Sequence, residues 1–83
     1  MNERTTKVAI VSGGATLIGL ACARALVDTG YRVALADINA GDGEKMAADL
    51  GEHAMFVKTD ITLDADIDAC VNAVSERWGG VDA

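Results

Sequence analysis

The sequence predicts an α/β fold built on a doubly wound parallel sheet. Two observations lead to this class. Short, continuously apolar runs alternate with longer segments whose apolar residues recur at helical spacing. The loops between them are short, so the order β-α-β-α-β-α implies parallel strands joined by right-handed helical crossovers. Eighty-three residues leave room for at most one small domain of this kind.

Three apolar segments are the predicted strands. Residues 7–12 (KVAIVS), 31–36 (YRVALA) and 54–59 (AMFVKT) have the composition of strands that are covered on both faces. A glycine turn follows the first strand, and the second and third lead into Asp37 and Asp60. In such sheets ligands bind beyond the carboxyl ends of the strands, so we expect these features to converge on one rim.

Helical periodicity follows each strand. The first helix is expected to begin at Leu17 and to end at Gly30, because glycine favours helix termination. Asn39 or Asp42 can cap the second helix, and Thr62 or Asp64 the third. The apolar stripes of the three helices consist of Ile18, Ala21, Cys22, Ala25, Leu26 and Thr29, then Met46, Ala47 and Leu50, then Ile67, Val71, Val74 and Trp78.

Charge and hydropathy exclude several classes of partner. The net charge is −6, from 7 basic and 13 acidic residues, and the basic residues are scattered. A nucleic acid partner requires a basic surface, so none is expected. No apolar run approaches the roughly 20 residues that a membrane span needs. Residues 1–7 lack the apolar core of a signal peptide, so we expect no membrane association and a cytoplasmic location.

Cysteine and histidine usage does not indicate a metal site. Cys22 and Cys70 both fall in helical patterns, where we expect two buried thiols in a reducing compartment. His53 is the only histidine, and no C-x-x-C pair occurs. We therefore expect no metal and assign no role to His53.

The turn VSGGATLIG at residues 11–19 is the first candidate for a binding site. Residues 14–19 have the G-x-x-x-x-G spacing of a P-loop. A P-loop continues with Lys and then Ser or Thr, whereas Leu20 and Ala21 stand here. Without that positive charge and that metal ligand, nucleotide hydrolysis is not expected.

A dinucleotide turn fits better. The pattern T-G-x-x-x-G-x-G matches from Ser12, with Gly13 and Gly19 in place and Leu17 at the position of the middle glycine. Gly13 allows a sharp exit from the strand, and Gly19 allows the helix to pack closely on the sheet. The N–H groups around Thr16 to Ile18 would face a pyrophosphate. Leu17 is expected to crowd that group or to force a local left-handed conformation.

Four elements in order resemble the short-chain dehydrogenase/reductase family. They are the turn at residues 12–19, the acidic strand end at residues 36–37, the run TDIT at residues 59–62 and the run WGGVDA at residues 78–83. The resemblance implies a Rossmann-type βαβαβα fragment. Residues 1–83 would be the N-terminal portion of a single NAD(P)-binding domain, truncated before a fourth strand that pairs with the first.

The acidic residue after the second strand indicates the cofactor. Asp37 lies 18 positions after Gly19, close to the roughly 20 expected of the acid that binds the adenosine ribose. Its carboxylate would accept hydrogen bonds from both ribose hydroxyls and repel a 2′-phosphate. Arg32 lies at the opposite end of the strand, so NAD is favoured over NADP.

The resemblance implies further roles around the adenine. Asp60 would accept from the adenine amino group, the Ile61 N–H would donate to a ring nitrogen, and Ile38 would flank the ring. The family transfers hydride between nicotinamide and an alcohol or carbonyl substrate. The family's catalytic Ser, Tyr and Lys lie downstream of residue 83. Tyr31 cannot stand for the catalytic Tyr, because Leu35 rather than Lys lies four positions later. We therefore expect no catalytic residue here, and an inactive chain without its remainder.

Two other interpretations stay open from sequence. The chain could be a non-catalytic dinucleotide-binding module. A flavodoxin-like or receiver-type fold would explain Asp60 but not the glycine turn. For an enzyme of the resembling family, the expected partners are the substrate, the remainder of its own chain and further copies of itself as a homo-oligomer.

Overall fold

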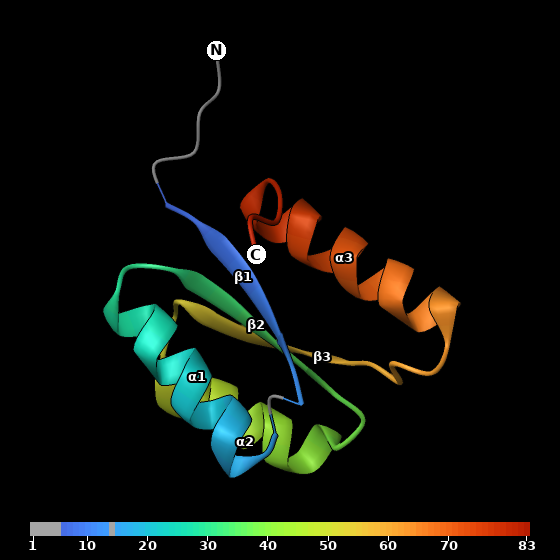
Figure 1. The fold of residues 1–83 in the computed structure, drawn as a ribbon, viewed down its shortest axis with the longest axis horizontal. Helices are drawn as coiled ribbons and strands as arrows, with labels where there is room; N and C mark the ends of the chain where they lie inside the picture. Colours follow the sequence, from blue (N-terminus) through green and yellow to red (C-terminus); the bar gives the residue numbers. More distant parts are fainter. Residues whose placement is uncertain (1–5, 14) are drawn as a thin grey trace.

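The fold is a parallel sheet of three strands with helices on both faces (Figure 1). The computed structural model describes residues 6–13 and 15–83. Gly14, the first position of the P-loop spacing, and residues 1–5 lie outside that description. The elements are β1 (Val8–Ser12), α1 (Leu17–Asp28), β2 (Arg32–Asp37), α2 (Ala40–Leu50), β3 (Ala54–Lys58) and α3 (Asp64–Trp78). The predicted order of elements and the predicted fold class are both confirmed.

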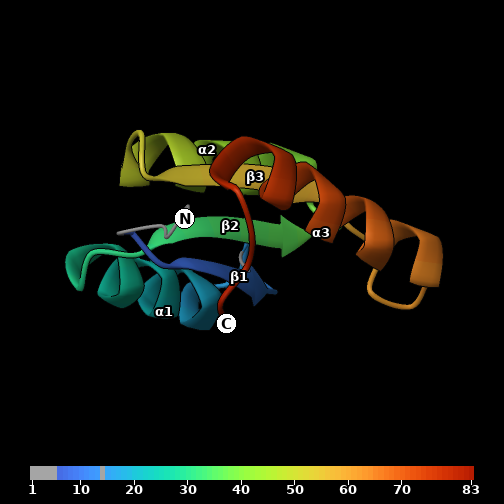
Figure 2. The same ribbon diagram turned by 90° about the horizontal axis from the view of Figure 1, so that it is seen from above.

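Strand β2 is the centre of the sheet and of the core. It pairs in parallel with β1, Ile10 opposite Ala34, and with β3, where Phe56 lies opposite Leu35. Val33 and Leu35 face α1 and α2, and the alternate residues of β2 face α3. Figures 1 and 2 show helices on both sides of the sheet, with α3 on the face opposite to α1 and α2. The continuously apolar strand pattern is therefore explained by burial on both faces.

The end of the chain lies beside β1, on the side away from β2 (Figure 1). The Val8 carbonyl accepts from the N–H groups of Asp82, at 2.8 Å, and Ala83, at 3.2 Å, and the Ile10 N–H donates to the Ala83 carbonyl at 3.1 Å. The Asp82 carboxylate also accepts from the Val8 N–H at 2.8 Å. This is the place at which sequence analysis expected a fourth strand.

A glycine ends α1 and a polar cap begins α2, as predicted. The Gly30 N–H bonds to the Val27 carbonyl and the Tyr31 N–H to the Leu26 carbonyl, each at 2.9 Å, which is a Schellman motif after α1. Asn39 caps α2, because its side-chain oxygen accepts from the Asp42 N–H at 3.2 Å.

The predicted apolar face of α1 is wrong. Gly19 and Ala23 are buried against the sheet, and Leu26 packs there as expected. The small side chain of Ala23 and the absence of one at Gly19 let the helix approach closely, and this contact fixes its rotation. Cys22 is exposed, so only Cys70 fits the expectation of buried thiols. The other members of the stripe that face solvent are Ile18, Ala21, Ala25 and Thr29.

Helix α3 also differs from its prediction, in how much of its apolar face is covered and in its capping. Cys70, Val74 and Trp78 form its buried face. Ile67 and Val71, which were expected on that face, are 39% and 41% exposed. The helix begins after Leu63 without a side-chain cap, since the hydroxyl of Thr62 is bonded elsewhere and Asp64 is already helical; both predicted caps are wrong. No helix in the described part of the chain could cross a membrane.

Candidate functional site

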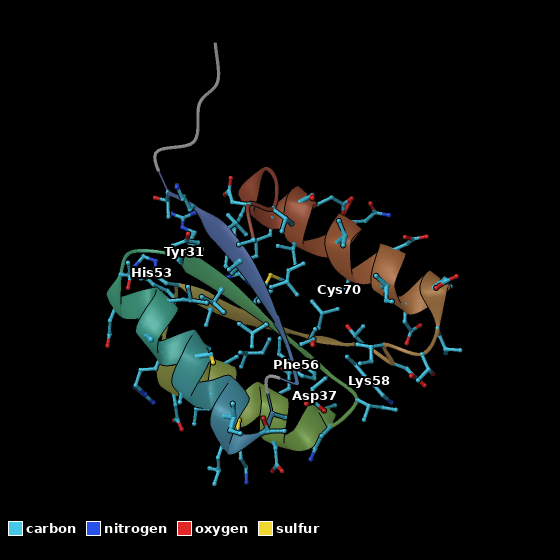
Figure 3. The ribbon with its side chains drawn as sticks, viewed as in Figure 1. Tyr31, Asp37, His53, Phe56, Lys58 and Cys70 are labelled. Carbon is cyan, nitrogen blue, oxygen red and sulfur yellow. The ribbon has the colours of Figure 1, made fainter. Side chains whose placement is uncertain are left out.

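The carboxyl ends of the three strands meet around one pocket of about 210 Å³. Its lining comes from the ends of β1, β2 and β3 and from the residues that follow them. Figure 3 shows Asp37 at this end of the sheet, with Tyr31 and His53 at the opposite end. The convergence expected from topology is present. The lining residues are Gly13, Ala36, Asp37, Ile38, Thr59, Asp60 and Ile61.

The turn after β1 begins at a glycine in the left-handed region. Gly13 has φ +70°, and its N–H donates to the Ala36 carbonyl at 2.9 Å. A side chain at this φ would be strained, which explains the glycine. The Gly13 carbonyl accepts from the Thr16 N–H at 3.1 Å and from the Thr16 hydroxyl at 2.8 Å. The turn is thus tied both to β2 and to the start of α1.

The N-terminus of α1 offers backbone donors next to this turn. Thr16 caps the helix, since its hydroxyl oxygen accepts from the Gly19 N–H at 3.0 Å. No hydrogen bond within residues 6–13 and 15–83 uses the N–H groups of Leu17 or Ile18. First-turn N–H groups have no partner inside a helix and carry the positive end of its dipole. They are suited to an anion such as a pyrophosphate.

Leu17 does not distort the turn. It is the first residue of α1, and no non-glycine residue among those described has a positive φ. The alternative of a left-handed conformation at this position is therefore wrong. Its side chain is 82% exposed. That it crowds a pyrophosphate stays a prediction.

Asp37 is held by two backbone donors. Its Oδ2 accepts from the Ala15 N–H at 3.1 Å, and its Oδ1 accepts from the Asn39 N–H at 2.9 Å. The second bond is an Asx turn, which the spacing of the two residues allows. The first joins residues 22 positions apart, and no sequence pattern points to it. It links the carboxylate expected at the ribose to the turn expected at the pyrophosphate.

Asp60 lies across the pocket in a polar turn. Its Oδ1 accepts from the Thr62 N–H at 2.9 Å and from the Thr62 hydroxyl at 2.6 Å. These bonds stabilise the carboxylate, the hydroxyl most, and lower its pKa below the ordinary value. Its own N–H donates to Asp66 Oδ2 at 2.9 Å. Sequence analysis missed Asp66, although an acidic residue in the first turn of α3 was visible.

Replacing Thr62 by valine should raise the pKa of Asp60 toward the ordinary aspartate value, because the hydroxyl donor is lost while the backbone donor remains. The direction follows from charge-assisted hydrogen bonding, which favours the ionised form. A titration of the Asp60 carboxyl carbon by NMR in both proteins measures the change. Thr29→Val is the control, since its hydroxyl bonds a helix carbonyl and no acid. An unchanged Asp60 pKa in Thr62→Val would contradict this assignment.

Two of the remaining predicted site residues line the pocket, and a third lines the pocket next to it. Ile38 and Ile61, 60% and 58% exposed, present apolar surface to the pocket. Ser12 is not part of that lining. It lines an adjoining apolar pocket of about 220 Å³ against α3, which shares Ala36, Thr59 and Ile61 with the first. The two pockets together extend along the strand ends.

The described residues offer binding groups rather than a catalytic constellation. They contain no cluster of three or more His, Cys, Asp or Glu side chains that could hold a metal ion. Tyr31 lies at the far end of the sheet from the pocket (Figure 3). Acceptors at Asp37 and Asp60 and donors at the start of α1 can recognise a polar ligand with a ring and an anionic group.

A family model described as short chain dehydrogenase matches residues 7–83. Among curated relatives, 3-beta-hydroxysteroid dehydrogenase of Comamonas testosteroni is 42% identical over 78 residues, which cover 94% of this chain and 31% of the relative. Sorbitol dehydrogenase of Cereibacter sphaeroides is 43% identical over 76 residues, or 92% of this chain and 30% of the relative. The chain thus spans about 30% of these relatives.

A solved structure agrees with these relatives. The 3-ketoacyl-(acyl-carrier-protein) reductase from Brucella melitensis, in complex with NADH, superposes with a TM-score of 0.89 at 33% sequence identity. The match covers 92% of this chain and 31% of the reductase. The likeness therefore extends over nearly all of the sheet and helices described above.

Proposed function

This chain belongs to the short-chain dehydrogenase family, and we propose that it supplies the cofactor-binding part of an NAD-dependent oxidoreductase. In this proposal residues 1–83 form the N-terminal portion of a single dinucleotide-binding domain. The reaction is hydride transfer between nicotinamide and an alcohol or carbonyl substrate. Because the described residues include no catalytic group at the pocket, these 83 residues alone are expected to be inactive.

The pocket at the strand ends is the observation that carries the proposal. It joins Asp37 and Asp60 to two exposed isoleucines within one space of about 210 Å³. These groups would suit an adenosine: Asp37 would accept from its ribose hydroxyls, and Ile38 and Ile61 would flank its adenine. Asp60 would accept from the adenine amino group, and the Ile61 N–H would donate to a ring nitrogen.

The start of α1 would hold the pyrophosphate. The N–H groups of Leu17 and Ile18 are unbonded among the described residues, and Thr16 fixes the turn that presents them. Gly19, buried against the sheet, lets α1 approach closely enough to place this first turn beside the strand ends. When bound, the dinucleotide supplies the nicotinamide that accepts or donates hydride. The chain's own groups bind and orient it.

The charge at the pocket favours NAD over NADP. Asp37 stands where a 2′-phosphate would have to lie, and no Lys or Arg is among the pocket's lining residues. A phosphate there would meet the Asp37 carboxylate, and none of the residues that line the pocket carries a positive charge to offset that repulsion. The NADH in the similar Brucella reductase is consistent with this choice.

Two measurements test the proposal. Titration calorimetry is expected to show NAD binding by this chain. NADH absorbance should rise when NAD and a member of a panel of secondary alcohols and polyols are combined with a longer protein that carries these residues together with the catalytic groups. Absence of NAD binding would refute the proposed cofactor. If that longer protein binds NAD but forms no NADH from any alcohol and consumes no NADH with the matching ketones, the non-catalytic binding module is favoured.

A further inference from the structure

We propose that Asp37 is also a positioning residue, which holds the glycine turn in its binding conformation. The expected effect on dinucleotide binding rests on the proposed function, whereas the hydrogen bonds of Asp37 do not. The Ala15 N–H donates to Asp37 Oδ2 at 3.1 Å. This bond connects the turn after β1 to the end of β2.

Two neighbouring residues of β2 hold the turn. The Ala36 carbonyl accepts from the Gly13 N–H at 2.9 Å, and the Asp37 carboxylate accepts from the Ala15 N–H two positions later. The Asn39 N–H, at 2.9 Å from Asp37 Oδ1, fixes the carboxylate in turn. Figure 3 shows Asp37 beside this turn. The bond between Gly13 and Ala36 joins backbone atoms and is kept when Asp37 is substituted, whereas the bond to Ala15 depends on the Asp37 side chain.

The carboxylate has the capacity for both roles at once. Each carboxylate oxygen carries about two lone pairs, and each one here accepts a single backbone N–H. One acceptor position per oxygen is left for a ribose hydroxyl. The ribose can therefore bind without releasing Ala15, and the turn stays fixed while the ligand enters.

The fixed turn matters for the pyrophosphate. The Gly13 carbonyl bonds both the N–H and the hydroxyl of Thr16, and Thr16 caps α1. A loose turn would leave the cap and the N–H groups of Leu17 and Ile18 to be ordered on binding. Such ordering reduces affinity, and a preformed site avoids that loss.

Asn is the informative substitution at this position. Asp37→Asn keeps the shape of the side chain, but its amide has one oxygen and one NH₂ group. The oxygen can accept from Ala15 or from Asn39, while the NH₂ group meets the other donor. One of the two backbone bonds is lost. Asp49→Asn is the matched control, since Asp49 is an exposed acid on α2.

The first experiment is hydrogen–deuterium exchange by mass spectrometry on the ligand-free protein. In Asp37→Asn, peptides that cover residues 13–16 are expected to exchange about tenfold faster, as the loss of one charged hydrogen bond implies. Asp49→Asn should leave them unchanged. Peptides from α3 report whether the variant is folded; should it fail to fold, Asp37→Ser takes its place. An unchanged exchange rate in the turn overturns the proposal.

The second experiment separates positioning from contact with the ribose. The ligand is an NAD analogue that lacks both hydroxyls on the adenosine ribose, so it has no hydrogen bond to Asp37 to lose. Asp37→Asn should still weaken its binding by about three- to tenfold, because the turn must be ordered on binding. Equal affinity of the two proteins for the analogue overturns the proposal. If Asp37→Asn exchanges faster in the turn but the wild-type protein does not bind NAD, the positioning role of Asp37 stands and only the proposed function is refuted.

Discussion

Asp37→Ala should lower the affinity for NAD by about 10- to 100-fold. The substitution removes the charged acceptor of the ribose hydroxyls, and the net loss of one hydrogen bond to a charged group, about 1.5–3 kcal/mol, corresponds to about this range. It also removes the bond that fixes the Ala15 N–H. Calorimetric titration of wild type and variant measures the ratio. The affinity for NADP should fall less or rise, because a carboxylate no longer opposes the 2′-phosphate.

The control for this substitution is Asp49→Ala, an exposed acid on α2 that lies outside the pocket lining. It changes the net charge by the same amount, so a long-range charge effect on the dinucleotide would appear in both variants. We expect its affinity for NAD to equal that of wild type within about twofold. A loss of less than about threefold in Asp37→Ala would show that the ribose does not bind at this carboxylate.

Gly43→Ala should destabilise the protein by up to about 2 kcal/mol, although alanine is the better helix former by about 1 kcal/mol. Gly43 is buried in α2, and a Cβ atom there would overlap the ring of Phe56 on β3. The ring must then shift out of its place against α2. Overpacking of this kind costs about 1–3 kcal/mol. Thermal or urea unfolding of the two proteins measures the difference.

Gly41→Ala, two residues earlier in the same helix, is the matched comparison. The nearest atom to its added Cβ is Asn39 Oδ1 at 3.9 Å, an ordinary contact. Helix propensity is then the main effect, so this variant should be more stable than wild type by about 0.5–1 kcal/mol. The double variant Gly43→Ala/Phe56→Leu should recover part of the loss. Equal stability changes at positions 41 and 43 would rule out the Phe56 contact.

Gly43 is also an example of what sequence patterns do not contain. A glycine inside a helical segment predicts only a weaker helix, whereas here it makes room for an aromatic ring on the adjacent strand. The same limit explains the helix faces. Periodicity predicted α1 and α3, but the close approach at Gly19 and Ala23 decides which side of α1 is buried.

The parts that sequence did predict are local or topological. Glycine at position 30 ends α1 because the left-handed region suits it, and Asn39 caps α2 because its side chain reaches the first-turn N–H groups. Asp37 and Asp60 reach one rim because parallel strands end on the same side. Each of these follows from rules that need only neighbours in the chain or the order of elements.

The bonds that shape the site could not be predicted in this way. The Ala15 N–H meets Asp37 only after the crossover through α1 has placed β2 beside β1. Thr62 looked like a helix cap, yet its hydroxyl donates to Asp60, because Asp60 lies two residues before it and offers a charged acceptor. Such contacts depend on which of several nearby polar groups a side chain bonds in the folded protein.

The most direct test of the central claim is the binding of NAD and NADP to the wild-type protein, measured by calorimetry under the same conditions. The claim is that Asp37, in a pocket lined by no Lys or Arg, selects a dinucleotide with free ribose hydroxyls. We expect NAD to bind at least about tenfold more tightly than NADP, as one like-charge contact implies. Equal or tighter binding of NADP would contradict the assignment of Asp37 to the adenosine ribose.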